Sequence, residues 1–325
     1  MHILVVGGAG YIGSVTVDQL VGGGHDVTVL DNLVAGHREA LNPGAEFVQG
    51  DVRDEEALNR VFASHNFHAV INYGGYIIAP ESVRQPGRYF ANNIGGAIAL
   101  LNAMVTYGVT RFVFSSSAAV YGEPETIPIP EEHPMRPINP YGETKAAVER
   151  LLPWYENQFG LRSVSLRYFN AAGASGRLGE DHRPETHLIP NVLQAALGQR
   201  PAISLFGDDY PTRDGTCIRD YIHVSDLATA HLLALDKTET GSAAYNVGNG
   251  LGFSNREVIE AARRVSGEAI PVSEEPRRPG DPAELVASHE RIRAELGWAP
   301  SHADVEDIIE SAWRWHREHP KGYEA

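Results

Sequence analysis

A glycine-rich segment near the amino terminus constrains the fold of this chain more than any other feature. Residues Gly7–Gly13 read GGAGYIG, and they come directly after the apolar run His2–Val6. Glycines spaced in this way allow a tight turn and a close approach of the backbone to a pyrophosphate, and free N–H groups at a helix start favour an anion. Between a strand and a helix, the pattern predicts a dinucleotide-binding site. The candidate contacts are Gly7, Gly10, Tyr11, Ile12 and Gly13.

Short apolar runs alternate with longer amphipathic stretches as far as about residue 170. The predicted strands are His2–Val6, Val27–Leu30, Phe47–Gln49, Ala69–Ile71, Phe112–Ser115 and Ser163–Leu166. The predicted helices are Tyr11–Val21, Glu55–Ser64, Ile94–Tyr107 and Pro140–Phe159. This alternation predicts an α/β fold with a doubly wound parallel sheet of the Rossmann type, whose strands are buried on both faces.

The pattern loosens after about Asn170, where glycine, proline and polar residues dominate 171–185 and 207–215. A helix is expected at Val224–Asp236, a strand at Ala244–Val247 and an amphipathic helix at Asp304–Glu318. We therefore expect a dinucleotide-binding domain formed by residues 1–170, to which 217–249 return. Residues 171–216 and 250–325 are expected to form a smaller α/β substrate-binding lobe.

The composition limits the partners and the location of the protein. The chain has 42 acidic and 27 basic residues and a formal net charge of −15, which disfavours nucleic acid as a partner. It contains no apolar stretch of about 18 residues, so no membrane span is expected. Its single cysteine, Cys217, excludes an intrachain disulfide and is compatible with a cytoplasmic location. The histidines show no metal-ligand pair at helical spacing; His65 and His68 are the nearest case, and we expect no metal site.

Two acidic residues follow predicted strands and are candidates for binding an adenosine. A carboxylate at Asp31, with Asn32 beside it, accepts hydrogen bonds from both ribose hydroxyls and repels a 2′-phosphate, which predicts NAD rather than NADP. Asp51, with Val52 beside it, is expected near the adenine edge. A structural role in a turn or at a helix start stays open for both residues, and for Asp51 it is as plausible as the binding role.

A tyrosine and a lysine four residues apart are the candidate catalytic pair. Tyr141 and Lys145 stand at the start of a predicted helix, where this spacing places them on one face. A nearby ammonium group and a positively charged nicotinamide ring both stabilise a phenolate. Residues Ser115–Ser117 end a predicted strand at the edge of the sheet where ligands bind, so a serine hydroxyl there can relay a proton.

Together with motifs further along the chain, these residues resemble the extended short-chain dehydrogenase/reductase family, and within it the UDP-glucose/UDP-galactose 4-epimerase branch. The likeness covers nearly the whole chain. The motifs that carry it are Ser115–Gly122, Tyr141 with Lys145, Arg167–Asn170, His187–Pro190, Phe206–Thr212, Arg219–Val224 and Arg278–Asp281.

The resemblance implies a role for each of these residues. Tyr141 would be the catalytic base and acid, Lys145 its electrostatic partner and Ser117 the proton relay. Further cofactor contacts would come from Tyr73, Gly74, Gly75, Asn92, Ser115 and Tyr168. The UDP-sugar would be held by Phe169, Asn170, His187, Leu188, Phe206, Arg219, Tyr221, Arg278, Asp281 and Leu285.

The implied activity is the interconversion of UDP-glucose and UDP-galactose by transient oxidation at C4 with bound NAD. Leu285 stands where a tyrosine in relatives narrows the sugar pocket, so the N-acetylated sugars are expected to fit as well. The family also implies a homodimer, here through Ile94–Tyr107 and Pro140–Phe159.

The sequence distinguishes this activity from three alternatives to different degrees. The UDP-xylose/UDP-arabinose pair remains open as the substrate. A non-catalytic NAD-binding regulator is disfavoured because such proteins typically lose the tyrosine or the lysine. A 4,6-dehydratase is disfavoured because Ala118 and Ala119 follow Ser117, where a dehydratase usually has an Asp-Glu pair.

One segment, Asn72–Pro80, departs from the family pattern. Relatives usually have a His-Phe-Ala-Ala or His-Phe-Ala-Gly run where this chain has Asn72–Gly75, and Ile77 stands where some relatives have a lysine. Ile77 offers no charge to a phosphate, and the two glycines must be ordered on binding. These departures predict that NAD is retained less tightly than in relatives.

Overall fold

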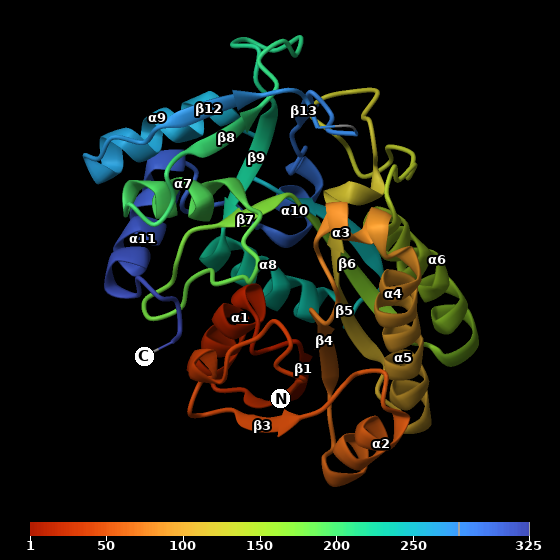
Figure 1. Ribbon diagram of the computed structural model, residues 1–325. Coiled ribbons are helices and arrows are strands. Elements are labelled where there is room, and N and C mark those ends of the chain that lie inside the picture. Colours follow the sequence, from red (N-terminus) through yellow and green to blue (C-terminus); the bar gives the residue numbers. More distant parts are fainter. Residues whose placement is uncertain (279, 325) are drawn as a thin grey trace.

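A seven-stranded parallel sheet forms the centre of the protein, whose computed structural model describes residues 1–278 and 280–324 (Figure 1). The strand order is β10-β6-β5-β4-β1-β2-β3, and every neighbouring pair is parallel. The strands are β1 (His2–Val6), β2 (Asp26–Asp31), β3 (Glu46–Gln49), β4 (Ala69–Asn72), β5 (Arg111–Ser117), β6 (Arg162–Tyr168) and β10 (Ala243–Val247). The predicted doubly wound α/β sheet is confirmed.

Two hydrophobic cores cover the two faces of this sheet. Along β1, Ile3 and Val5 pack into one core, whereas Leu4 and Val6 pack into the other. The strand therefore reads as an unbroken apolar run, because successive side chains point to opposite faces and both faces are buried. One core is completed by α1 (Tyr11–Gly22), α8 (Val224–Lys237) and α10 (Glu290–Leu296), and the other by α2 (Glu55–Ser64), α5 (Gly96–Thr106) and α6 (Pro140–Phe159).

Several short helical segments connect these elements. A helix was expected to start at Ile94. In the structure, Ile94 lies in a π-helical segment, Phe90–Gly95, which continues directly into α5. The other short segments are a 3-10 turn at Arg38–Ala40, α3 (Ala79–Arg84), α4 (Pro86–Tyr89) and a 3-10 turn at Ala118–Val120.

A second group of elements packs around its own hydrophobic core. A four-stranded sheet contains β7 (Asn170–Ala172), β9 (Ile218–His223), β11 (Gly252–Ser254) and β13 (Glu284–Leu285), and β8 (Ile203–Phe206) pairs with β12 (Val272–Glu275). The helices of this core are α7 (Leu188–Ala196), α9 (Asn255–Ser266) and α11 (Val305–Glu318). Figure 1 shows these three helices grouped beside β8 and β12, on the opposite side of the molecule from α4, α5 and α6.

The chain crosses between the two groups more than once. Within residues 217–249, α8 and β10 pack with the large sheet, whereas β9 pairs with β7, β11 and β13 in the smaller one. Near the carboxyl terminus, Ile292 of α10 packs against the core of the large sheet. Among the described residues, no helix has both the length and the apolar character that a membrane crossing requires.

Candidate active site

A cavity lies at the carboxyl ends of β1, β2, β4, β5 and β6, where ligands bind in open parallel sheets. The expected cofactor residues that line it are Gly7, Gly10, Tyr11, Ile12, Gly13, Asp31, Asn32, Val52, Tyr73, Gly74, Gly75, Asn92, Ser115 and Tyr168. The expected catalytic and substrate residues that line it are Ser117, Tyr141, Phe169, Asn170 and His187.

Two glycine turns meet at the floor of this cavity. Gly7 has a φ of 77°, and a Cβ built on it would lie 2.9 Å from the amide nitrogen of Gly74. A Cβ on Gly13 would lie 2.3 Å from the carbonyl oxygen of Gly7. Side chains are therefore excluded where the backbone turns into α1, and the exposed N–H groups form the kind of cradle that a pyrophosphate needs. The site fits the dinucleotide that the glycine motif predicts.

Asp31 both lines the cavity and holds the glycine turn. Its carboxylate accepts hydrogen bonds from the backbone N–H groups of Ala9 at 3.0 Å and Leu33 at 2.8 Å. Burial raises the pKa of this carboxyl, and the hydrogen bonds from Leu33 and Ala9 oppose the rise. The side chain is thus fixed at the end of β2, beside the position expected for the adenosine ribose.

Asp51 has a different environment from the one expected. Arg53 donates to its carboxylate at 2.7 Å and Asn32 donates at 3.1 Å. The hydrogen bond from Arg53 holds the pKa of Asp51 well below its usual range. Val52 lines the cavity, but Asp51 does not. Both oxygens of Asp51 thus accept hydrogen bonds within the protein, and its expected contact with the adenine edge stays a prediction.

Tyr141 enters the cavity from the first turn of α6. The Asn139 side chain caps this helix by accepting from the N–H of Gly142 at 2.9 Å, and the N–H of Tyr141 donates to the Ser82 hydroxyl at 3.1 Å. Burial raises the pKa of the Tyr141 phenol, and a hydrogen bond with Ser117 acts in the opposite direction. The protein alone therefore favours the neutral phenol, and a phenolate requires additional positive charge.

Lys145 lies behind Tyr141 rather than in the cavity wall. Its ammonium group donates to the Ser115 carbonyl oxygen at 2.6 Å and lies 5.9 Å from the centre of the Tyr141 ring. Burial of this side chain lowers its pKa to about 8. Tyr141 and Lys145 thus lie on one helix face as expected, with the ammonium group of Lys145 near the Tyr141 ring.

The ends of β5 and β6 place further hydroxyl groups in the same wall. Ser117 lies opposite Tyr168 in the parallel register of these strands, and the Ser115 hydroxyl is hydrogen-bonded to the Tyr168 phenol. Burial raises the pKa of Tyr168, so this phenol stays protonated. It can donate a hydrogen bond but is a poor base.

Most of the expected UDP-sugar residues lie in the smaller lobe, outside the lining of this cavity. The Arg278 guanidinium stacks over the Phe206 ring at 3.7 Å, and Arg219 lies 3.8 Å from the carboxylate of Asp281. We refer to these four residues, together with Leu188 at the start of α7, buried Tyr221 on β9 and Leu285 on β13, as the second cluster; none of the seven lines the cavity. Pro279, which belongs to the Arg278–Asp281 motif, lies outside the described residues.

Leu285 connects this second cluster with the catalytic wall. It lies opposite Arg219 in the register of β13 and β9. Its side chain packs with Phe169 against the small core that contains Ala118 and Tyr121, directly after Ser117.

The atypical loop after β4 is held by two asparagine side chains, Asn72 within the loop and Asn93 from the π-helical segment. Asn72 accepts from the N–H of Gly74 at 2.9 Å, and Asn93 accepts from the N–H of Tyr76 at 2.8 Å. Asn93 also donates to the carbonyl oxygen of Tyr76 at 3.0 Å. The glycines are therefore already ordered, and the expectation of weaker NAD retention now rests on Ile77, which lines the cavity without a charge.

Sequence reasoning also missed part of the cavity wall. Glu180, His182 and Arg183 line it next to Tyr11, and all three lie in a segment predicted only as a loop. Their spacing matches neither a helix nor a strand, so no local periodicity indicated that their side chains gather. Glu81 and Tyr89 also line the cavity, where the Tyr89 hydroxyl donates to the Glu81 carboxylate at 2.8 Å.

Residues 3–248 match the NAD dependent epimerase/dehydratase family. The chain belongs to this family. Among its relatives, a UDP-glucose 4-epimerase from Lacticaseibacillus casei is 52% identical over 327 residues, which cover 99% of each chain.

Solved structures of other family members agree with the fold described above. The UDP-glucose 4-epimerase from Brucella ovis in complex with NAD is 44% identical with a TM-score of 0.94, over 96% of this chain and 97% of that one. The UDP-glucose 4-epimerase from Bifidobacterium longum in complex with NAD⁺ and UDP is 38% identical with a TM-score of 0.95, over 99% of this chain and 100% of that one.

Proposed function

We propose that this chain is a UDP-sugar 4-epimerase that interconverts UDP-glucose and UDP-galactose with NAD bound in the cavity. The observation that carries the proposal is that Tyr141 and Ser117 line the same cavity as the glycine cradle, with Lys145 directly behind them. A base and a proton relay thus lie next to a dinucleotide site. The full-length similarity to UDP-glucose 4-epimerases from several organisms supports the same assignment.

The residues of the chain supply proton transfer and positioning. When bound, NAD supplies a reversible acceptor for the hydride of the sugar C4. The Tyr141 phenolate would accept the proton of the C4 hydroxyl and return it to the same oxygen after the sugar has turned over. Because the hydride would also return to C4, the net redox change would be zero. Ser117 bridges the sugar oxygen and the phenol. Lys145 and the positive nicotinamide together lower the free energy of the phenolate, which burial otherwise disfavours.

The second cluster suits the uridine diphosphate part of the substrate. Guanidinium groups form paired, charge-assisted hydrogen bonds with phosphate oxygens, and Arg219 and Arg278 stand on neighbouring parts of the smaller lobe. We also assign to the binding of the UDP-sugar the residues Asn170, His187, Leu188, Phe206, Tyr221, Asp281 and Leu285. This local positive charge explains how a chain with a net charge of −15 binds an anion.

Alternative reactions of the same family are less well supported. Ala118 follows Ser117 in a 3-10 turn and contributes no acid or base, which argues against a dehydratase. Both Tyr141 and Lys145 are present, which argues against a regulator without activity. The UDP-xylose/UDP-arabinose pair would fit the same chemistry and is distinguished by assay.

We further propose a cytoplasmic homodimer that buries the outer faces of α5 and α6. On α6, Trp154 is 73% exposed and Phe159 is 49% exposed, and Ile98 of α5 is also exposed. Large apolar groups on neighbouring helices are typical of a protein–protein contact. We also propose a two-part division in which 1–170 and most of 217–249 hold the cofactor and 171–216 and 250–325 hold the UDP-sugar; β9, which carries Arg219 and Tyr221, belongs to the UDP-sugar side because it pairs with the smaller sheet.

The decisive experiment combines ligand identification with one variant. The purified protein is denatured, and the released small molecules are identified by mass spectrometry and ultraviolet absorbance; NAD is expected. Turnover is then measured with UDP-galactose and UDP-arabinose. Tyr141→Phe is expected to lower turnover by about 10²–10⁴-fold, because it removes the base, while NAD stays bound.

Tyr245→Phe is the matched control. The Tyr245 hydroxyl donates a 2.6 Å hydrogen bond to Glu295, and Tyr245 does not line the cavity. This variant should leave turnover unchanged. A Tyr141→Phe variant that retains most of its activity would contradict the proposal.

A further inference from the structure

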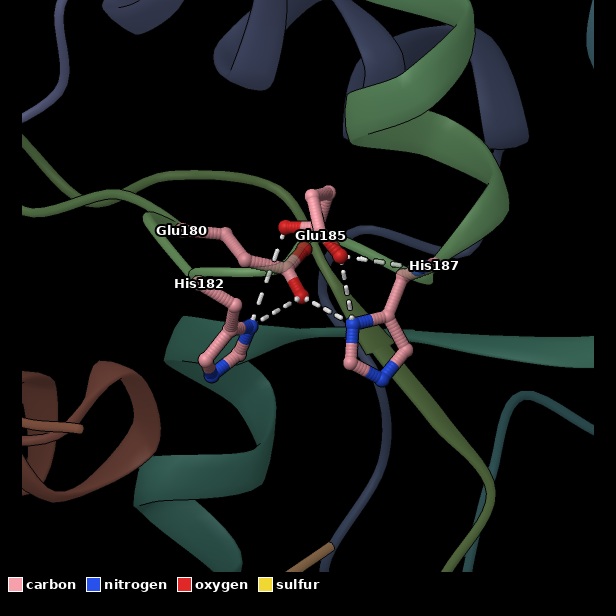
Figure 2. Close-up of side chains that lie close together, drawn as sticks. All are labelled: Glu180, His182, Glu185 and His187. Carbon is pink, nitrogen blue, oxygen red and sulfur yellow. Dashed lines mark hydrogen bonds and ion pairs between the residues drawn. The ribbon is translucent and has the colours of Figure 1, made fainter. Parts of the chain in front are cut away.

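Four side chains from one loop converge on a single point in the wall of the cavity. Figure 2 shows the imidazoles of His182 and His187 turning their Nδ1 atoms toward the carboxylates of Glu180 and Glu185. His187 Nδ1 lies 2.8 Å from Glu180 and 3.0 Å from Glu185. His182 Nδ1 lies 3.1 Å from Glu180 and 3.8 Å from Glu185. One ligand atom from each residue lies within 4.8 Å of the other three.

These separations match the edges of a small coordination tetrahedron. Nitrogen and carboxylate oxygen ligands lie at about 2.0–2.2 Å from Zn²⁺, so two ligands of a tetrahedral site are separated by about 3.3–3.6 Å. The four histidine–carboxylate separations span 2.8–3.8 Å around that value. Glu185 faces His187 with Oε1 and His182 with Oε2, so binding of an ion at the centre requires this carboxylate to turn one oxygen toward it.

The charge of the cluster also calls for a cation. The side chains of Glu180 and Glu185 are only 5% and 3% exposed, so water screens their mutual repulsion poorly. Within the part of the chain that the structure describes, no lysine or arginine forms an ion pair with either carboxylate. A divalent ion with two neutral imidazoles balances the two negative charges.

We propose that Glu180, His182, Glu185 and His187 bind one divalent transition-metal ion of the zinc type. Two imidazoles favour such an ion over Mg²⁺ or Ca²⁺, which prefer oxygen ligands alone. Four protein ligands complete a tetrahedral shell and leave no open position, so the site is structural rather than catalytic.

The surroundings of the cluster indicate what the ion does. Glu185 also accepts from the N–H groups of Thr186 at 2.7 Å and His187 at 2.8 Å, and these bonds orient one ligand as a supporting shell does. His187 directly precedes α7, and the His182 ring packs edge-on against Tyr11 of α1. The ion cross-links the loop between β7 and α7 and thereby fixes the cavity wall that adjoins the cofactor cradle.

In the competing state, no metal ion is bound and both histidines of the cluster are protonated. Although burial opposes it, hydrogen bonds with Glu180 and Glu185 raise the pKa of His182 to about 9. Two imidazolium–carboxylate pairs would then take the place of the ion. The two states differ in metal content, which makes them separable by direct measurement.

The test uses the full chain, stripped with a chelator and reloaded with Zn²⁺. Elemental analysis after dialysis is expected to give one zinc per chain, and the thermal midpoint is expected to rise with zinc concentration. Co²⁺ is expected to give the intense visible spectrum of a tetrahedral site. Hydrogen exchange in residues 173–187 should slow when zinc is added.

His182→Gln and Glu180→Gln are each expected to lower zinc affinity by more than about 100-fold, since loss of a supporting-shell partner alone costs 10–100-fold. His65→Gln is the matched control, because His65 lies 2.9 Å from Glu46 in a lone histidine–carboxylate pair. It should leave zinc affinity unchanged. Wild-type protein that binds no zinc, or zinc binding that survives in both His182→Gln and Glu180→Gln, would overturn the proposal.

Discussion

The ammonium group of Lys145 donates a 2.6 Å hydrogen bond to the carbonyl oxygen of Ser115, which ties the first turns of α6 to the end of β5. This contact fixes the lysine one helical turn behind Tyr141, with its charge beneath the ring. Among the described residues, the buried ammonium group has one hydrogen-bond acceptor, and its pKa is lowered; its protonation state controls the charge next to the phenol.

The pH dependence of activity follows from that burial. Lys145 has a pKa of about 8, below the usual value near 10.4 for lysine, so the ammonium form is present below pH 8 and is lost above it. We expect kcat/KM to fall as pH rises through about 8. Lys145→Met should lower kcat by about 10²–10⁴-fold and should lack this alkaline decline. A decline near pH 8 that persists in Lys145→Met would assign it to another group.

Gly7→Ala is expected to abolish NAD binding and to destabilise the fold. The left-handed backbone at this position costs about 1–2 kcal/mol for any residue with a Cβ, and the added methyl would meet the Gly74 backbone at 2.9 Å. Gly22→Ala is the control, because a Cβ at the end of α1 meets nothing within 4 Å. Urea unfolding and NAD titration of both variants check the prediction; equal stability of the two would contradict it.

Removal of Glu149 tests the buried ion pair between α6 and β6. The Arg167 guanidinium lies 2.6 Å from Glu149, and both side chains are less than one-tenth exposed. Glu149→Ala leaves a buried charge without its partner, and we expect a loss of about 3–5 kcal/mol in the free energy of unfolding. Glu310→Ala breaks an exposed pair with Arg314 and should cost less than about 1 kcal/mol. If the two variants lose similar amounts of unfolding free energy, burial of the ion pair does not determine how much its loss destabilises the protein.

Sugar selectivity is predicted to depend on Leu285. Leu285 and Phe169 pack against the same small core next to the catalytic wall, so we expect the size of residue 285 to set the room beside C2 of the sugar. We expect measurable kcat/KM for UDP-N-acetylgalactosamine, and Leu285→Tyr should lower it by about 10–200-fold relative to UDP-galactose. If kcat/KM for UDP-galactose exceeds that for UDP-N-acetylgalactosamine by more than about a thousandfold, and Leu285→Ala leaves this ratio unchanged, residue 285 does not control sugar selectivity.

Ile77→Lys is expected to tighten NAD retention. Ile77 lines the cavity beside Gly74 and Gly75, so an ammonium group there would meet the phosphates. Val83→Lys adds the same charge at an exposed position outside the cavity lining and should have no effect. The measurement is the NAD content after gel filtration together with the response of activity to added NAD⁺. Full loading of the unmodified protein would contradict the prediction.

Local sequence patterns are sufficient to predict the central sheet and the position of the catalytic pair. Strands buried on both faces produce continuous apolar runs, so the predicted ends of β1, β2 and β4–β6 lie within two residues of the observed ends. The glycine cradle and the Tyr141–Lys145 spacing are local patterns as well, since a turn and one helical turn fix their geometry.

No local sequence pattern predicts the smaller sheet, the pairing of Asp51 or the convergence of Glu180, His182, Glu185 and His187, which depend on the folded arrangement of the chain. Strands β7, β11 and β13 have three, three and two residues, too few for a periodic signal, and they form through pairing with distant β9. Asp51 was predicted to face a ligand, but Arg53 and Asn32 compete for its oxygens. The Glu180–His187 loop has no repeating backbone geometry, so the direction of each side chain depends on long-range packing that spacing along the chain does not encode.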